Sequence, residues 1–256
     1  MTDLKQRVVW ITGASSGIGR ALVLDCARRG ANVVLSARNN AQLKAVQTEA
    51  RLNAGNSLVI PLDLTKYSQF GKSVAQALKK FGAVDYLFNN GGISQRSLAH
   101  ETHMKVYEEI MAVNYLGNIA LTLELLPHMR ERKSGAITVI SSVAGKLGTH
   151  LRTGYSASKF ALSGFYEALR AENWRENIQV TMVYPGFVRT NVSINARTGS
   201  GKPQGKMDSA LEKGISAEEC ARRTVDAVVA GKNEVYISGA RERFGVYMNR
   251  FFPGLF

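Results

Sequence analysis

The N-terminal part of the chain combines a short apolar strand, a glycine-rich turn and an amphipathic helix, an order that few folds accommodate. The run RVVWITGA is rich in β-branched residues and stops at Gly13, and GIGRALVLDCARRGA then repeats apolar residues at helical spacing up to Gly30. Further strands are expected at 32–38, 57–64, 84–92, 135–142, 178–186 and 233–238, alternating with helices at 40–53, 67–81, 104–133, 154–174 and 216–230. This alternation predicts an α/β fold with a doubly wound, mostly parallel sheet covered by helices on both faces.

We expect one domain over residues 1–256, because α/β folds often reach this length as a single unit. Two segments depart from the strand–helix rhythm. Residues 191–214 are rich in Gly, Ser, Asn and Lys and are predicted to form a mobile substrate loop, with a plain surface excursion as the alternative. The apolar and basic extension at 240–256 is expected to pack on the sheet or on a second subunit, or else to contact a membrane surface.

Composition argues against several classes of protein. Cys26 and Cys220 lie far apart in predicted helices without a neighbouring His or Cys, so we expect buried thiols, no metal site and a reducing cytoplasm. No apolar leader opens the chain and no run of about 18 apolar residues follows, so it is expected to be neither secreted nor membrane-spanning. The net charge of +13 is scattered without a nucleic-acid motif, which favours a phosphate-bearing small ligand over nucleic acid.

The turn TGASSGIGR stands where a parallel α/β sheet binds nucleotides. Gly13, Gly17 and Gly19 would let backbone N–H groups approach a pyrophosphate, although glycines also serve ordinary turns. The second strand ends in LSAR, where Arg38 can pair with a 2′-phosphate that a carboxylate would repel. The sequence therefore predicts NADP(H) in preference to NAD(H), with a solvated Arg38 as the alternative. Asp63 would accept from the adenine amino group or form a turn.

The run YSASK places Tyr155 and Lys159 four residues apart on one face of a predicted helix. A phenol titrates near about 10, and a neighbouring ammonium lowers its pKa because it favours the phenolate. Ser142 ends the preceding strand, and its hydroxyl could donate to a carbonyl oxygen while Tyr155 delivers the proton. Three histidines in nearby loops are expected at the surface rather than in the chemistry: His100, His103 and His150.

Taken together, these motifs resemble the short-chain dehydrogenase/reductases of the single-domain type. The likeness runs from residue 7 to about 240 and rests, in order, on TGASSGIG, LDL at 62–64, NNGG at 89–92, VN at 113–114, SS at 141–142, YSASK and PGFVRT at 185–190. The resemblance implies a Rossmann fold and an enzyme that uses NAD(P) to interconvert a carbonyl and an alcohol. It also implies a homodimer or homotetramer, because the helix of Tyr155 and the preceding helix often form subunit interfaces in this family.

Carried over by position, the resemblance assigns four catalytic roles. Tyr155 would be the general acid in carbonyl reduction and the base in alcohol oxidation. Lys159 would lower the phenol pKa and hold the nicotinamide ribose, and Ser142 would orient the carbonyl. Asn114 would anchor a water that links Lys159 to solvent.

The same resemblance implies the cofactor contacts. Asn90 would stabilise the central sheet beside the adenosine, and Gly91 follows it where the family usually has Ala. Ser15 and Arg38 match the 2′-phosphate contacts of NADP-preferring members. The implied set is Gly13, Ser15, Ser16, Gly17, Ile18, Gly19, Arg38, Asp63, Leu64, Asn90, Gly91, Tyr155, Lys159, Val188, and, on the nicotinamide side, Pro185, Gly186 and Thr190.

Within the family, NNGGISQRSL and LPHMRERKSG are similar to the reductases called dehydrogenase/reductase member 7. Many of those are membrane-associated and linked to retinoid, steroid or other hydrophobic carbonyls, usually behind an N-terminal anchor; we expect a cytoplasmic relative here. The predicted substrate is a small-to-medium hydrophobic ketone, aldehyde or alcohol. The alternatives are a 3-oxoacyl-carrier-protein reductase, whose acidic partner would suit a basic surface, and a non-catalytic NADP(H)-sensing protein.

Overall fold

The computed structural model describes residues 4–255, so the ends of the predicted domain and of its C-terminal extension, residues 1–3 and 256, lie outside the described residues. The described chain contains a seven-stranded, all-parallel sheet in the order β3-β2-β1-β4-β5-β6-β7. This confirms the doubly wound α/β fold. The strands are β1 (Val8–Thr12), β2 (Asn32–Ala37), β3 (Ser57–Pro61), β4 (Tyr86–Asn89), β5 (Gly135–Ile140), β6 (Ile178–Pro185) and β7 (Glu234–Ile237).

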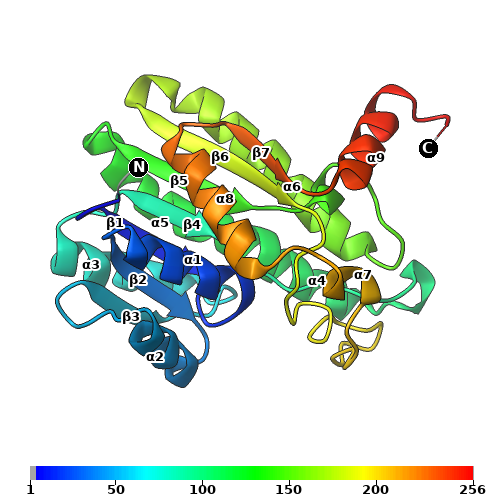
Figure 1. Ribbon diagram of the computed structural model, residues 1–256, viewed down its shortest axis with the longest axis horizontal. Coiled ribbons are helices and arrows are strands. Elements are labelled where there is room, and N and C mark those ends of the chain that lie inside the picture. The colour runs from blue at the N-terminus through cyan, green and yellow to red at the C-terminus, as the bar shows by residue number, and fades with distance from the viewer. Residues whose placement is uncertain (1–3, 256) are drawn as a thin grey trace.

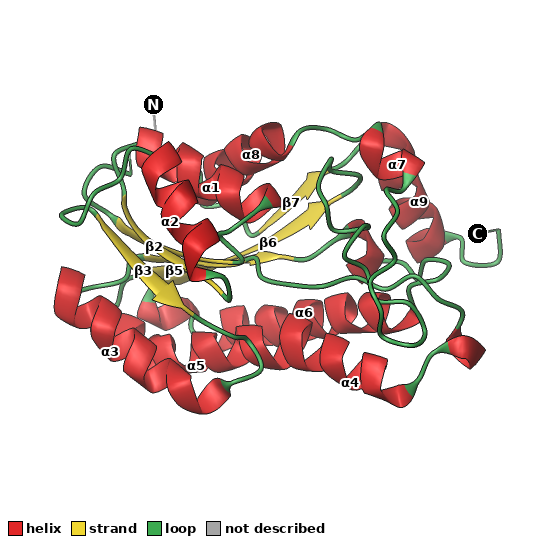
Figure 2. Cartoon of the chain, turned by 90° about the horizontal axis from the view of Figure 1, so that it is seen from below, coloured by secondary structure: helices red, strands yellow, loops and turns green. Residues whose placement is uncertain are grey.

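Helices cover both faces of this sheet (Figures 1 and 2). One face carries α1 (Gly17–Arg28), α2 (Asn40–Glu49) and α8 (Ala217–Val229). The other carries α3 (Phe70–Phe81), α4 (Met104–Met111), α5 (Gly117–Glu131) and α6 (Thr153–Glu172). The short α7 (Ser209–Glu212) and the C-terminal α9 (Ala240–Phe251) stand outside these two layers.

Successive residues of each strand face opposite helix layers and so build two cores. In β1, Val9 and Ile11 belong to the core shared with α1 and α8, whereas Trp10 belongs to the core shared with α3, α5 and α6. Strands covered on both faces read as unbroken apolar runs, which is why the sequence located them. Cys26 and Cys220 are free thiols buried in the first core, as expected.

The expected helix at 104–133 departs from α geometry upstream of Pro127. α4 passes through a π-helical turn at Ala112–Leu116 into α5, and Pro127 lies inside α5. Among the described residues, Met104–Glu131 is the one helix that passes a length-and-composition test for a membrane span. Of its apolar window, 44% is buried inside the structure, and Leu121, Leu125 and Met129 are fully buried against the sheet.

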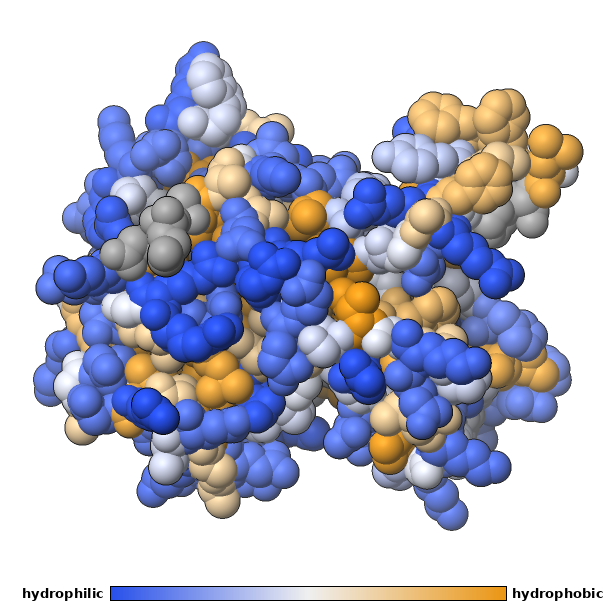
Figure 3. All heavy atoms as spheres, in the orientation of Figure 1, coloured by the Kyte–Doolittle hydropathy of each residue, from blue (hydrophilic) through white to orange (hydrophobic). Residues whose placement is uncertain are grey.

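Two predicted surface features remain predictions. α9 projects from the body of the protein (Figure 1) and carries a group of apolar side chains (Figure 3), with Phe244, Tyr247, Phe251 and Phe252 exposed. The subunit contact or membrane contact expected of this segment stays a prediction. Leu123 on α5 and Phe160 on α6 are also exposed, at the helices for which a subunit interface was expected.

Gly117 lets α5 lie close against the segment that follows β3. A Cβ at this position would lie 2.2 Å from the carbonyl oxygen of Leu64. We therefore expect Gly117→Ala to lower the free energy of unfolding in urea by about 2–3 kcal/mol. The matched control is Gly164→Ala in α6, where nothing lies within 4 Å of the added Cβ, and it should change stability by less than about 1 kcal/mol. Equal stability of the two variants would contradict this close approach.

Candidate active site

A cleft of about 1520 Å³ runs along the carboxyl ends of the strands. Its walls include Thr12 at the end of β1, Ile140 at the end of β5 and Pro185 at the end of β6. The strand order reverses between β1 and β4, and this switch point is where open α/β sheets bind ligands. The volume exceeds the roughly 300–1,000 Å³ of an ordinary ligand pocket, so it has room for a dinucleotide and a second molecule.

The glycine-rich turn lies at one end of this cleft and fits an anion. Gly13 and Gly17 line it, and the Ser16 side chain forms no capping hydrogen bond at the start of α1. Helix N–H groups at such an end can bind a pyrophosphate. Gly19 does not line the cleft; a Cβ there would lie 2.1 Å from the carbonyl oxygen of Gly13, so this glycine is needed for α1 to pack on the turn. Other predicted contacts that line the cleft are Ser15, Ile18, Leu64, Asn90, Gly91, Pro185, Gly186, Val188 and Thr190.

Arg38 and Asp63, which were predicted to contact the adenosine part of the cofactor, both line the cleft. Arg38 is exposed, and Ser15 is also part of the lining. The Asp63 Oδ1 atom accepts from the Thr65 backbone N–H at 3.0 Å and the Thr65 hydroxyl at 2.9 Å, so this carboxylate forms the turn that was one of its two predicted roles. Burial opposes ionisation of Asp63, but the hydrogen bonds from Thr65 and the charge of Arg38 outweigh it and lower its pKa. The adenine contact stays a prediction.

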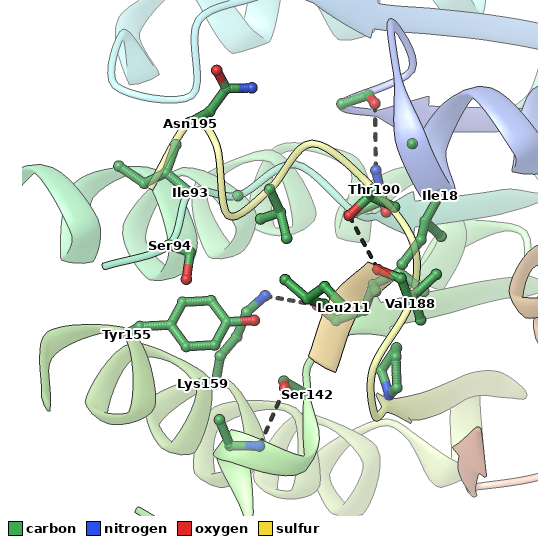
Figure 4. Close-up of a pocket in the computed structure, with 18 of the residues that line it drawn as sticks. Ile18, Ile93, Ser94, Ser142, Tyr155, Lys159, Val188, Thr190, Asn195 and Leu211 are labelled. Carbon is green, nitrogen blue, oxygen red and sulfur yellow. Dashed lines mark hydrogen bonds between the residues drawn. The ribbon is translucent and has the colours of Figure 1, made fainter. Parts of the chain in front are cut away.

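Tyr155, Ser142 and Lys159 meet in the middle of the cleft (Figure 4). Tyr155 lies in the first turn of α6, and Ser142 follows β5, where its Oγ accepts from the Ala144 N–H at 3.2 Å. The Lys159 ammonium is buried and donates to the carbonyl oxygen of Ile140 at 2.8 Å. Its nitrogen lies 5.8 Å from the centre of the Tyr155 ring. Tyr155 and Lys159 therefore lie in one site with Ser142, as the sequence predicts.

The pKa values of this pair differ from the sequence-based expectation. Burial raises the pKa of Tyr155, against the smaller opposing effects of the Ser142 hydroxyl and the charges of Arg152 and Arg96. Burial also lowers the pKa of Lys159 to about 8. Desolvation of the phenol outweighs the effects of its neighbours on this pKa, and the Lys159 ammonium is engaged by a backbone carbonyl. The predicted effect of Lys159 on the phenol pKa stays a prediction.

The side chains of Asn114 and Asn90 form hydrogen bonds with backbone groups around the site. Asn114 is buried in the π-helical turn, accepts from the Ile93 N–H at 2.7 Å, and donates to the Ile93 carbonyl at 2.9 Å and to Ser158 Oγ at 3.0 Å. It does not line the cleft, and its side chain is occupied, so the water relay stays a prediction. Asn90 Nδ2 donates to the Thr12 carbonyl at 2.9 Å and thereby joins β4 to β1.

Sequence reasoning missed Gln95. This buried side chain accepts from the Gly154 N–H at 2.7 Å and the Tyr155 N–H at 3.3 Å, so it caps the helix that carries the phenol. No local pattern links two segments that lie 59 residues apart. Arg96 and Arg152 also line the cleft. The three histidines that were expected at the surface are exposed and do not line the cleft: His100, His103 and His150.

Comparisons with known proteins agree on one group. A family profile described as short chain dehydrogenase matches residues 7–201. The chain is 40% identical over 260 residues to mouse dehydrogenase/reductase SDR family member 7B, covering 99% of this chain and 80% of the relative. It is 37% identical to human dehydrogenase/reductase SDR family member 7, covering 98% and 76%.

Solved structures give the same fold. A short-chain dehydrogenase/reductase from Burkholderia phymatum, crystallised in complex with NAD, superposes with a TM-score of 0.89 at 22% identity, covering 100% of this chain and 96% of that chain. A short-chain dehydrogenase from Streptomyces avermitilis superposes with a TM-score of 0.83 at 26% identity, covering 98% and 94%.

The burial of Lys159 predicts a pH-dependent stability. Its pKa of about 8 in the folded protein lies below the ordinary value of 10.5. At neutral pH, burial of the charged ammonium therefore lowers the free energy of unfolding. Between about pH 8 and about pH 10 the unfolded chain binds more protons at this site, and stability should rise with pH. Urea denaturation of wild type and Lys159→Met over this range isolates the effect: the variant lacks this contribution, so wild type should gain stability relative to it. A difference that does not change with pH would show that Lys159 titrates normally.

Proposed function

The chain belongs to the short-chain dehydrogenase/reductase family of oxidoreductases, and on this premise we propose that it interconverts a carbonyl and a secondary alcohol with NADP(H). Tyr155 is the proposed general acid in reduction and general base in oxidation. The observation that carries this proposal is the meeting of Tyr155, Ser142 and the buried Lys159 in a cleft that continues to the glycine-rich turn.

Each side chain has a role that follows from its position. When bound, the nicotinamide would supply the hydride for reduction and accept it in oxidation. In reduction the carbonyl carbon takes the hydride and the carbonyl oxygen takes a proton from the Tyr155 hydroxyl, while Ser142 donates a hydrogen bond to that oxygen. The phenolate that remains is favoured by a positive charge nearby, which Lys159 provides in its ammonium form. Gln95 holds the start of α6 so that the phenol keeps its place.

The preference for NADP(H) is supported by charge at the adenosine end. Arg38 and Ser15 both line the cleft, and a guanidinium pairs well with a phosphate. A 2′-phosphate on the ribose would take this place. The acidic residue Asp63 also lines the cleft, and its carboxylate accepts hydrogen bonds from Thr65.

Apolar side chains contribute to the lining of the cleft, which supports a carbonyl compound with a hydrophobic part as substrate. They include Ile93, Leu147, Val192 and Leu211. The net charge of +13 favours a second candidate, the reduction of 3-oxoacyl groups on an acidic carrier protein. Turnover of carrier-bound 3-oxoacyl thioesters without turnover of free ketones would identify that reaction.

Replacing the phenol tests the catalytic assignment. Tyr155→Phe should lower kcat for ketone reduction by roughly 10²- to 10⁴-fold, because the oxygen loses its proton donor. Tyr247→Phe on the exposed α9 is the matched control and should keep wild-type kcat. Steady-state assays that follow the nicotinamide absorbance give both values. Equal activity of the two variants would rule out Tyr155 as the proton donor.

Replacing Arg38 tests the cofactor preference. Arg38→Ala should raise KM for NADPH by roughly 10- to 100-fold and leave KM for NADH within about threefold, because only NADPH carries the 2′-phosphate. Lys44→Ala, an exposed cation on α2, should change neither constant. A wild-type enzyme that has the lower KM for NADH would overturn the preference itself.

A further inference from the structure

Two arginines line the cleft near Tyr155, and one carboxylate serves both. Arg96 follows β4, Arg152 immediately precedes α6, and Asp208 lies just before α7 in the segment 191–214. The Asp208 Oδ2 atom accepts from Arg96 Nε at 2.8 Å and from Arg152 Nη2 at 3.4 Å. Both arginines line the cleft, whereas Asp208 does not. The two positive charges therefore reach the cleft, and the negative charge that they share lies outside its lining.

Arg96 has its hydrogen bonds satisfied by the protein. Its side chain is 8% exposed. Nε and Nη2 both donate to Asp208, and Nη1 donates to Ser94 Oγ at 2.8 Å and to the carbonyl oxygen of Gln95. This guanidinium therefore fastens the segment 191–214 to the loop after β4, and it has little capacity left for a ligand.

Arg152 is in the opposite situation. Within the described chain, its guanidinium makes one hydrogen bond, the long one to Asp208, and its Nε atom is buried without a partner. A guanidinium offers five N–H donors, and a buried donor without an acceptor is costly. Its side chain is 21% exposed. Burial, and then the charge of Arg96, lower the pKa of Arg152, as expected for a cation that is only partly compensated.

The charges at this end of the cleft do not balance. Arg197 also lines it, but Glu109 holds that guanidinium with two hydrogen bonds, of 2.6 and 2.9 Å. Arg96 and Arg152 share the single carboxylate of Asp208, which leaves one positive charge beside Tyr155. Such a charge is screened less in a partly buried site than at an open surface.

We propose that the carbonyl substrate carries an anionic group that binds Arg152, so that this residue determines the substrate class. Carboxylate and phosphate share the required chemistry, because both are acceptors that pair with a guanidinium. The proposal rests on the proposed function, since Tyr155 must define where the carbonyl lies. Arg152 and Tyr155 line the same cleft, so one small molecule can present its anionic group to the first and its carbonyl to the second.

Matched aryl ketones test this inference. para-Acetylbenzoate, para-acetylphenyl phosphate and methyl para-acetylbenzoate have the same acetyl group on a benzene ring and differ in charge. We expect wild type to show a kcat/KM for at least one anionic ketone that exceeds the value for the ester by roughly tenfold or more. Calorimetric binding of the same ketones to the enzyme with NADP⁺ provides a readout that does not depend on turnover.

Variants of the arginines assign the effect to one side chain. Arg152→Met should lower the ratio of kcat/KM for the favoured anionic ketone to kcat/KM for the ester, and the corresponding ratio of affinities, by roughly 10- to 100-fold. Arg152→Lys should keep part of the preference, because it keeps the charge and loses the planar geometry. Arg197→Met is the matched control: it removes a lining arginine that is already paired, so the ratio between anion and ester should stay as in wild type.

The outcomes separate this inference from the proposed function. Equal or better binding and turnover of the ester in wild type would overturn the anionic subsite, while loss of that turnover in Tyr155→Phe would uphold the oxidoreductase chemistry. An anion preference that survives in Arg152→Met would also overturn the assignment to Arg152. Preference for the carboxylate over the phosphate, or the reverse, identifies which anion the subsite takes.

Discussion

The site depends on the join between β1 and β4, where the strand order of the sheet reverses. Asn90 closes this join with a hydrogen bond to the Thr12 carbonyl, and the Thr12 hydroxyl accepts from the backbone N–H groups of Asn90 and Gly91 at 3.0 Å. These bonds hold the glycine-rich turn beside the loop that follows β4. A cleft can therefore open over the strand ends without leaving buried backbone groups unpaired.

Burial of positive charge organises the rest of the site. Lys159 lies in the protein interior, where its ammonium donates to the Ile140 carbonyl. The charges of Arg96, in the loop after β4, and of Arg152, at the start of α6, act on the same phenol. Desolvation raises the pKa of Tyr155, while the arginine charges act in the opposite direction. The phenol is thus kept protonated by burial and made easier to ionise by its neighbours, and a proton donor needs both properties.

Much of this arrangement could be predicted from sequence because its signals are local. Strands buried on both faces appear as apolar runs, and Tyr155 and Lys159 share a helix face because they are four residues apart. Gln95 was missed because it contacts the start of α6 across 59 residues, and the Arg96–Asp208 pair spans 112. Propensity and periodicity carry no information on such contacts, since tertiary packing decides them. The π-helical turn around Asn114 was missed for the same reason.

The excess positive charge near Tyr155 also bears on the acidity of its phenol. With the cleft open to solvent, Arg152 and Arg96 favour the phenolate. An anionic group bound to Arg152 would cancel part of that effect, and the phenol would then hold its proton more firmly. Burial already keeps Tyr155 protonated, so the bound anion would leave it in the form that reduction requires and lower its acidity. Through Arg152, the same charge would select the substrate and adjust the pKa of the group that acts on it.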